Sequence, residues 1–425
     1  MPRLPLFAGF RPEAPAVWHR GAVISQGRFV AQAQRLAQQL PAAPYAINLC
    51  ADRYRFMLAF AAICLRGQTN LLPSSPATGA VEALRARHPD SYTLTDGMLD
   101  GQADGSAQYC PDIAAAQVAA VLFTSGSTGT PQAHAKSWRT LSVIALHLSQ
   151  RLLDERPAHI VATVPPQHMY GLETTVLMAL GAGCTVHSAR PLFPQDVVQA
   201  LAEVPAPRVL VTTPVHLRAL VESAAALPPL QFILSATAPL SAGLASACEA
   251  AWNAPVLEIY GCTEAGSTAT RRTLDGPRWH LLPEMRIAHD GVPTVHAAHL
   301  PEPVPLQDVL EADGPEHFRL LGRSADLLKV AGKRASLGDL TQRLLSIPGV
   351  QDAVIFKVTE GEAARPAALV VAPTLSEAQI LQALARQVDA AFLPRPLRKV
   401  AQLPRNELGK LPRQQLLALL GASDG

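Results

Sequence analysis

The chain has 425 residues, with 36 Lys and Arg against 34 Asp and Glu, so its net charge is close to zero. Proteins that coat nucleic acid draw their affinity from a concentrated basic surface, and this balance argues against that class. The length indicates two or three domains, and 48% hydrophobic against 16% charged residues indicates a folded chain with a large core.

Cysteine spacing and the N-terminus bear on the compartment. The six cysteines are scattered without a CxxC pair, mostly in apolar runs, which predicts buried reduced thiols and not a disulfide framework or zinc site. Residues 1–15 lack the pattern of a signal peptide, and the apolar segment 56–65 is too short to span a bilayer. We therefore expect a cytoplasmic protein without a membrane span.

Short apolar runs alternate with longer helical ones along most of the chain. Strand–helix pairs are predicted at 44–50 and 53–67, 118–124 and 136–153, 159–164 and 171–183, and 208–213 and 214–226, with further strands at 232–237 and 256–261. All-apolar strands separated by helices are typical of an α/β fold with mostly parallel sheets covered by helices. Ligands of such sheets bind at the carboxyl ends of the strands.

The pattern changes near residue 323, after a Pro-rich segment at 292–306. A helix at 336–347, strands at 352–358 and 367–373, and a helix at 376–392 predict a small α+β unit of a size that folds by itself. We expect a large N-terminal domain over 1–322 and a small C-terminal domain over 323–425.

Residues 121–138 read VLFTSGSTGTPQAHAKSW, a strand-like run followed by glycines and hydroxyls. Such a loop can wrap the oxygens of a polyanion, because glycine permits close approach of the backbone, although a plain turn has the same composition. A P-loop is excluded because Gly126 and Gly129 are too close together and no Lys-Ser/Thr follows.

The full phrase resembles the phosphate loop of the acyl/aryl-adenylate-forming superfamily, T-S-G-[ST]-T-G-x-P-K. The matching residues are Thr124, Ser125, Gly126, Ser127, Thr128, Gly129 and Pro131. The resemblance implies that the loop binds the phosphates of ATP, with Thr128 near Mg²⁺. Gln132 stands where the family has lysine. Either its amide replaces the lysine, or Lys136 supplies the cation, or the site is weakened; these alternatives stay open.

Two further segments resemble the walls of the acid pocket in this superfamily. PPQHMYG (165–171) is similar to its Pro-x-x-His-x-x-Gly segment, which implies that His168 borders the acyl pocket, although a lone histidine is more often structural. SATAPLS (235–241) looks like the loop against adenine and the acid, which implies contacts from Ala236, Thr237 and Ala238.

IYGCTEAG (259–266) matches the family's Tyr-Gly-x-Thr-Glu. The resemblance implies that Tyr260, next to Gly261, stacks on adenine, that Thr263 contacts the α-phosphate, and that Glu264 holds Mg²⁺. An ordinary strand and turn with a surface glutamate is the alternative interpretation.

LLGRSADLLKVAGKRASL (320–337) resembles the family's hinge, G-R-x-D-D-x-I-K-x-x-G-x-R. It implies that Arg323 binds the ribose together with Asp308, that Arg334 contacts phosphate, and that Lys329 serves the thioester-forming pose. Ala325 replaces the usual hinge carboxylate.

LPRNELGKLPRQQLLALL (403–420) resembles the family's C-terminal motif, which makes Lys410 the candidate catalytic lysine, whereas a lone terminal lysine is normally solvated. The cations of 395–405 either steer an acidic carrier protein or the phosphates of CoA, or are simply solvated.

The resemblance spans about residues 45–420 and implies an ATP- and Mg²⁺-dependent acid–thiol ligase. The phrases NLCADRYRFMLAFAA, FTSGSTGTPQ and LLKVAGKRASL look most like short AMP-ligases of bacterial aryl-polyene and xanthomonadin pigment pathways. Those ligases imply a hydroxybenzoate-like acid loaded onto an acyl carrier protein. A CoA ligase is the alternative, and a degenerate nucleotide-binding module, with Gln132 and Ala325 as marks of decay, is a third.

Overall fold

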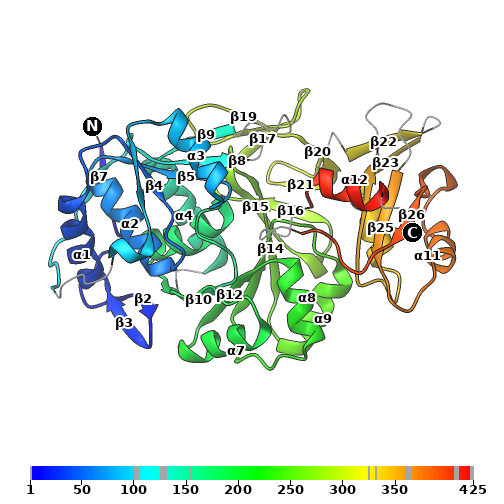
Figure 1. Ribbon diagram of the computed structural model, residues 1–425, viewed down its shortest axis with the longest axis horizontal. Coiled ribbons are helices and arrows are strands. Elements are labelled where there is room, and N and C mark those ends of the chain that lie inside the picture. The colour runs from blue at the N-terminus through cyan, green and yellow to red at the C-terminus, as the bar shows by residue number, and fades with distance from the viewer. Residues whose placement is uncertain are drawn as a thin grey trace.

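The computed structural model describes residues 2–99, 105–124, 132–153, 156–323, 326–330, 333–358, 366–405 and 411–421. It confirms the predicted α/β fold, with a large N-terminal part and a smaller C-terminal part. The N-terminal helices, in blue, lie at one end of the long axis, and the C-terminal elements, in orange and red, lie at the other (Figure 1). The boundary after residue 322 stays a prediction.

One sheet of the N-terminal part carries the start of the phosphate loop. In the described residues its strand order is β6-β4-β5-β8-β9, with β9 antiparallel to β8 and the other pairs parallel. The strands are β4 (Tyr45–Asn48), β5 (Thr69–Leu72), β6 (Ser91–Leu94), β8 (Val118–Thr124) and β9 (Gln132–Ser137). Nearby helices are α1 (Gln26–Gln39), α2 (Arg53–Leu65) and α3 (Thr78–Arg87).

Side-chain alternation buries both faces of this sheet. Ala46 and Leu72 join the main core that contains α2, whereas Ile47 and Leu71 join Val81 of α3 in a separate cluster. Successive strand residues point to opposite faces, so an all-apolar strand requires a helix on each side. The sequence indicates this arrangement.

A second, larger sheet has the order β20-β21-β16-β15-β14-β13-β12-β10-β11-β2-β3 in the part of the chain that the structure describes. Its members are β2 (Pro15–His19), β3 (Ala22–Ser25), β10 (His159–Ala162), β11 (Thr185–His187), β12 (Arg208–Thr212), β13 (Phe232–Ser235), β14 (Val256–Cys262), β15 (Gly266–Arg272), β16 (Arg278–Leu281), β20 (Asp308–Ala312) and β21 (His317–Arg323). The run from β2 to β14 is parallel, as predicted, and both flanks are antiparallel. Antiparallel neighbours need only short turns, which the alternating apolar pattern does not reveal.

Helices cover the parallel centre of this sheet on both faces. Ile160 and Val209 point into the main core beside α4 (Trp138–Leu152), while Val161 and Leu210 point into a second core. The second core is formed with α7 (Pro194–Glu203), α8 (Pro214–Glu222) and α9 (Ala242–Trp252), which lie in the lower part of the view in Figure 1.

Two predicted helices differ from the observed ones. The helix expected at 136–153 begins only at Trp138, because Gln132–Ser137 pair with β8 and Ser137 caps the helix by accepting the Thr140 N–H at 3.1 Å. The helix expected at 171–183 is divided into α5 (Met169–Gly171), a π-helical turn (Leu172–Leu177) and α6 (Met178–Ala182). Isolated π-helical turns are rare and often occur at functional sites.

The remaining elements are short strands and the C-terminal part. Short strands are β1 (Arg3–Pro5), β7 (Asp112–Ala114), β17 (Arg286–Ala288), β18 (Thr294–His296) and β19 (Val304–Pro305). The C-terminal part contains β22 (Leu327–Val330), β23 (Lys333–Ser336), α10 (Leu337–Leu345), β24 (Asp352–Lys357), β25 (Pro366–Val371), α11 (Glu377–Ala385), β26 (Leu397–Lys399) and α12 (Arg413–Gly421). It has its own apolar core, which includes Leu344, Ile355 and Val370.

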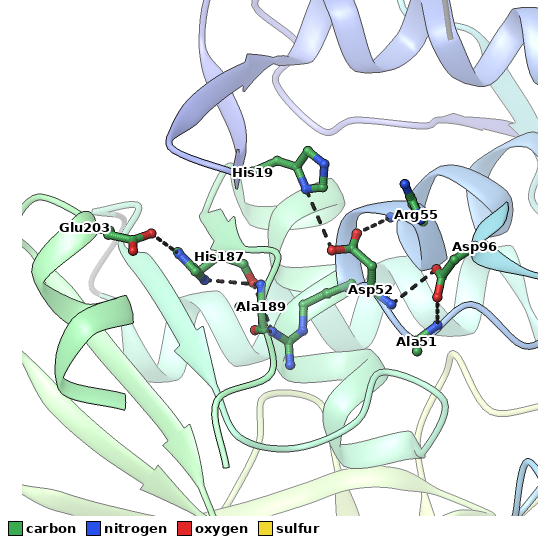
Figure 2. Close-up of polar contacts among 9 residues, drawn as sticks. His19, Ala51, Asp52, Arg55, Asp96, His187, Ala189 and Glu203 are labelled. Atoms are coloured by element: carbon green, nitrogen blue, oxygen red, sulfur yellow. Dashed lines mark hydrogen bonds and ion pairs between the residues drawn. The ribbon is translucent and has the colours of Figure 1, made fainter. Parts of the chain in front are cut away.

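A polar network fixes the start of α2 (Figure 2). Asp52 caps the helix by accepting the Arg55 N–H at 3.0 Å, and its other oxygen lies 3.8 Å from His19 Nδ1 at the end of β2. Asp96 accepts the N–H groups of Ala51 and Asp52. These bonds satisfy backbone donors that a helix start leaves free.

Arg53 is fully buried at the first position of α2 and ties that helix to the larger sheet. Its guanidinium donates to the backbone oxygens of His187, Ala189, Ala162 and Val164 at 2.7–3.0 Å. These oxygens lie at the carboxyl ends of β10 and β11. A single side chain therefore joins the start of α2 to two strands of the larger sheet.

The state of the cysteines and the length of the helices bear on two expectations from the sequence. All six cysteines are unpaired, and Cys50, Cys64, Cys184 and Cys248 are buried. In the ranges described above, the structure contains no helix of the length and apolarity that crossing a bilayer requires.

Candidate adenylate-forming site

Three segments meet where the phosphate loop begins and where β14 ends. The hydroxyl of Thr124, the last residue of β8, lies 3.1 Å from Nε2 of His134 on β9. The same nitrogen lies 3.5 Å from Oε1 of Glu264, in the turn between β14 and β15. The Glu264 side chain is 39% exposed, so its carboxylate is accessible to a ligand. The sequence motifs at 124 and 264 are therefore brought together.

The candidate nucleoside-binding residues are also neighbours. Tyr260 donates its hydroxyl to Asp308 Oδ2 at 2.7 Å, and Asp308 is the register partner of Arg323 on the adjacent strand. The ring of Tyr260 is nearly buried against Trp279 and Phe318, with centroids 5.7 and 5.3 Å away. The structure thus juxtaposes Asp308 and Arg323, which lie 15 residues apart in the sequence.

The loop of Ala236, Thr237 and Ala238 follows β13 at the carboxyl edge of the sheet. Thr237 has a φ of +77°, a left-handed conformation that is unusual for a residue other than glycine. Such conformations cluster at ligand sites. Ala238 lines a cleft of about 660 Å³ whose other wall is formed by α10 and β24 of the C-terminal part.

The segment around His168 folds tightly back on itself. His168 occupies the N-cap position of α5 without a side-chain capping bond and is half-buried. Gly171 lies so close to the carbonyl of Pro165 that a Cβ would collide with that oxygen. Tyr170 donates its hydroxyl to backbone oxygens at the ends of β12 and β13, 3.1 and 2.9 Å away. These two bonds hold the Tyr170 ring against the sheet. The side chain of His168 remains partly exposed.

Gln132 and Lys136 occupy different environments. Gln132 is exposed and pairs with Thr124 at the start of β9. Lys136 is only 3% exposed, and its ammonium donates to the backbone oxygen of Glu264. Burial lowers the pKa of Lys136, against the opposing charge of Glu173. The Lys136 ammonium therefore contacts the turn through the backbone oxygen of Glu264.

Glu173 is missing from the residues that sequence motifs indicated. It lies in the π-helical turn, is 1% exposed, and accepts the Ser267 N–H at 3.1 Å as well as the Ser267 hydroxyl. Burial raises the pKa of Glu173 to about 7, although the Lys136 charge acts in the opposite direction. A lone carboxylate within the apolar run GLETTVLMALGAG was the available signal.

Several predicted residues cannot be placed. Lys329 and Arg334 are register partners on β22 and β23. Their side chains, and that of Arg323, are outside the described part of the structure, as are Ala325, Lys410 and the loop residues Ser125, Gly126, Ser127, Thr128 and Gly129. Their roles stay predictions.

A magnesium site of this kind needs only one or two ligands from the protein. The described ranges contain no cluster of three or more His, Cys, Asp or Glu side chains suited to a metal. Mg²⁺ typically keeps several waters and binds one or two carboxylates together with substrate phosphates. The accessible Glu264 carboxylate beside the phosphate-loop start fits that chemistry.

A two-part α/β fold with this placement of strand ends defines the class of AMP-forming acid–thiol ligases. The chain belongs to the family of AMP-binding enzymes, whose family model matches residues 16–295. It is 32% identical over 267 residues to 4-coumarate–CoA ligase of Rhodobacter capsulatus, covering 62% of this chain and 67% of the relative. It is 20% identical over 308 residues to 3,4-dihydroxybenzoate–[aryl-carrier protein] ligase of Bacillus anthracis, covering 69% and 72%.

Solved structures show the same fold. The o-succinylbenzoate CoA synthetase of Bacillus subtilis in complex with its acyl-adenylate intermediate superposes with a TM-score of 0.83 at 18% identity, covering 98% of each chain. The same enzyme in complex with ATP and a magnesium ion gives a TM-score of 0.81 at 18% identity, covering 98% of this chain and all of that one.

Proposed function

We propose that this protein activates a carboxylic acid with ATP and transfers the acyl group to a thiol. The acid is aromatic and hydroxybenzoate-like, and the acceptor is the phosphopantetheine thiol of an acyl carrier protein. The main support is the convergence of Thr124, His134 and Glu264 at 3.1 and 3.5 Å. These residues come from segments that the sequence assigns to one ATP site.

The first step joins two anions. A carboxylate oxygen of the acid forms a bond to the α-phosphorus of ATP, the bond to the bridging oxygen of the β-phosphate breaks, and pyrophosphate leaves. No general base is needed, because the acid is already ionised at neutral pH. The site must instead supply orientation and positive potential.

The charged end of ATP would be held around the Glu264 turn. Thr124 starts the phosphate loop, whose residues Ser125 to Gly129 offer hydroxyls and N–H groups, and Thr263 would contact the α-phosphate. Glu264 and Thr128 would hold Mg²⁺, which offsets phosphate charge when bound. Gln132 is exposed at the start of β9, where its amide can donate to the phosphates without a charge.

The adenosine would lie beside Tyr260 and Gly261, near the end of β14 that leads into the Glu264 turn. The Tyr260–Asp308 hydrogen bond fixes one carboxylate oxygen, and Asp308 would bind the ribose together with Arg323, its register partner on the adjacent strand. Gly261 and the loop of Ala236, Thr237 and Ala238 would border adenine and the acid, with His168 at the acyl pocket.

The C-terminal domain, 323–425, would supply Lys410 for adenylation and, after rotation about the hinge, Lys329 for thioester formation, with Arg334 on phosphate. Support comes from the cleft of about 660 Å³, which is lined both by Ala238 and by Leu411, the residue after Lys410. The hinge residue Ala325 lacks a carboxylate, but rotation needs backbone freedom more than one side chain.

In the second step the thiolate sulfur forms a bond to the acyl carbon, the bond from that carbon to the AMP oxygen breaks, and AMP leaves. A relative named as an aryl-carrier-protein ligase supports a carrier-protein acceptor, while the 4-coumarate–CoA ligase supports CoA as the alternative. A role in pigment biosynthesis rests on the resemblance of short phrases and is part of this proposal.

The decisive measurement is acid-dependent exchange of labelled pyrophosphate into ATP. We expect exchange with hydroxybenzoates, tested beside hydroxycinnamates and a medium-chain fatty acid. Exchange with only the fatty acid would contradict the aromatic assignment. ATP binding without exchange on any acid would instead identify a non-catalytic nucleotide-binding module. Thioester formation, compared with holo-acyl carrier protein and with CoA, then distinguishes the two acceptors.

Replacing Lys410 by Ala tests the catalytic lysine. Loss of a cation that acts in the transition state typically costs about 3 kcal/mol or more, so exchange is expected to fall at least about a hundredfold while ATP still binds. Lys399→Ala, an exposed lysine of β26, is the matched control and is expected to keep wild-type exchange. Wild-type exchange in Lys410→Ala would remove Lys410 from the mechanism.

A further inference from the structure

Two buried ionisable side chains, Lys136 and Glu173, pack against the turn that carries Thr263 and Glu264 and the strand that follows it. Lys136 reaches this turn from β9 and donates to the backbone oxygen of Glu264. Glu173 reaches it from the π-helical turn and holds Ser267, the second residue of β15. Lys136 therefore contacts the middle of the turn between β14 and β15, and Glu173 contacts the first residues of the strand that follows it.

The fit around Glu173 is tight. Ser267 donates both its backbone N–H, at 3.1 and 3.2 Å, and its hydroxyl to the Glu173 carboxylate. Gly266 has a φ of +79°, and a Cβ there would lie 2.5 Å from Glu173 Oε1. The backbone of the turn thus rests directly on the carboxylate, and the π-helical turn sets the position of Glu173.

Lys136 and Glu173 carry opposite charges that attract each other. Each is nearly inaccessible to solvent, with 3% of Lys136 and 1% of Glu173 exposed. Burying a lone charge is costly, and an opposite charge nearby reduces that cost. The other titratable groups that act on Lys136 or are acted on by it are His134, Cys262, Glu264 and His299. Among them only Glu264 is another carboxylate, and its side chain is turned to the accessible side, 3.5 Å from His134.

We propose that Lys136 and Glu173 are a positioning pair that holds Thr263 and Glu264 in register with the phosphate loop. This inference rests on the proposed function, because it assigns those two residues to ATP and Mg²⁺. Lys136 supports the phosphate site from below through the Glu264 backbone and does not take the place of the loop lysine that Gln132 replaces. Neither side chain touches substrate in this assignment.

The test compares wild type, Lys136→Met, Glu173→Gln and the double variant in acid-dependent pyrophosphate exchange. Each single variant is expected to lower kcat about tenfold to a hundredfold, since small misplacements of contacting groups cost that much, while KM for the acid stays near wild type. The double variant is expected to lose less than the product of the two single losses, because each change leaves the other charge without its partner.

The pH profile gives a readout that general destabilisation does not move. Burial raises the pKa of Glu173 to about 7, so kcat of the wild type is expected to rise with pH through that value as the carboxylate ionises and attracts Lys136. Glu173→Gln cannot ionise, and its profile is expected to lack this rise.

Glu249→Gln is the matched control. Glu249 is a largely buried carboxylate on α9 that is held by Arg272, and it accepts the N–H of Val256, the first residue of β14, at the opposite end of that strand from the turn. This variant is expected to lose stability and to keep the wild-type pH profile and kcat.

Multiplicative losses in the double variant, or a rise through pH 7 that persists in Glu173→Gln, would overturn the positioning pair. Should Lys136→Met fail to fold, the nearly isosteric Glu173→Gln and its pH profile decide alone. A wild-type protein that shows no exchange with any acid contradicts the proposed function first, and the pair together with it.

Discussion

Glu173 is a buried carboxyl group whose ionisation costs folding stability. Burial raises the pKa of its carboxyl group more than the bonds from Ser267 and the charge of Lys136 lower it, so the folded protein keeps the proton more tightly than the unfolded chain does. Residues that serve a site at the expense of stability are a common feature of enzymes. If Glu173 positions the turn, its charge should help activity and weaken the fold.

This cost predicts a specific pH dependence of stability. The pKa of Glu173 lies above its ordinary 4.5, at about 7, so the stabilisation from its protonated form is complete below about pH 4.5 and is lost as pH rises through 7. Glu173→Gln is neutral at every pH. Its free energy of unfolding is therefore expected to gain on the wild type by as much as about 3 kcal/mol between about pH 5 and pH 8.

Urea unfolding at several pH values across that range measures this difference. Leu416→Val, a change in the C-terminal part that adds or removes no charge, provides the control, whose offset from wild type should not vary with pH. A constant offset for Glu173→Gln as well would show that its carboxyl titrates alike in both states.

For helices and strands, the sequence predicts the central residues of an element better than its first and last residues. The apolar runs at 44–50, 118–124 and 208–213 are strands β4, β8 and β12 with nearly the predicted bounds. Helix 136–153 is wrong at its start, because pairing with β8 overrides the helical pattern of residues 136 and 137. The π-helical turn has no sequence signature in propensity or period, since it depends on packing around Glu173.

Helix α2 also depends on a contact that no local pattern predicts. Arg53 donates four hydrogen bonds to carbonyl groups more than a hundred residues away. Lysine keeps the charge but lacks the planar fork that reaches several acceptors at once. Arg53→Lys is therefore expected to lower the free energy of unfolding by about 3–5 kcal/mol, the usual cost of breaking a buried charged network.

Equilibrium unfolding in urea measures that loss. Arg343→Ala is the control, because this exposed arginine pairs only across one helical turn with Asp339 at 2.8 Å and elsewhere with a backbone oxygen. Exposed pairs of this kind contribute at most about 1 kcal/mol. Equal losses in the two variants would mean that the four carbonyl groups find other donors.

For the molecule as a whole, the structure brings together distant segments whose motifs the sequence assigns to one site, and the roles of their residues stay predictions. Thr124 and Glu264 meet through His134, and Asp308 lies beside Arg323 in register. The sequence names Lys136 only as a possible cation for the phosphates and does not indicate Glu173, which belongs to no motif; their shared place against the turn is visible only in the packed fold. The motifs indicate residues that we propose contact substrate. The residues that hold the turn in place come from other parts of the fold.

The C-terminal part carries a prediction at this scale. Arg405 makes a two-point bond to Asp352 on β24, at 2.7 and 2.8 Å, immediately before the segment that contains Lys410. Two-point Arg–carboxylate bonds fix geometry as well as charge. Asp352→Asn is expected to lower exchange several-fold with little change in KM for ATP, because the lysine segment loses its anchor.

Exchange kinetics at saturating acid measure this effect. Asp313→Asn removes a carboxylate that bridges Arg278 and Arg319 on strands of the N-terminal part, and it is expected to leave exchange unchanged. Full exchange in Asp352→Asn would show that the segment is positioned without this bond.

The close approach of Gly266 to Glu173 has a consequence for how this sequence can change over time. A methyl group at 266 would meet both a carboxylate oxygen and the end of Ile144, and the backbone there already has a left-handed φ of +79°. The isoleucine at 144 and the left-handed backbone still oppose a side chain at 266 when the acid at 173 is gone. Descendants of this chain are therefore expected to keep the glycine for longer than they keep the acid.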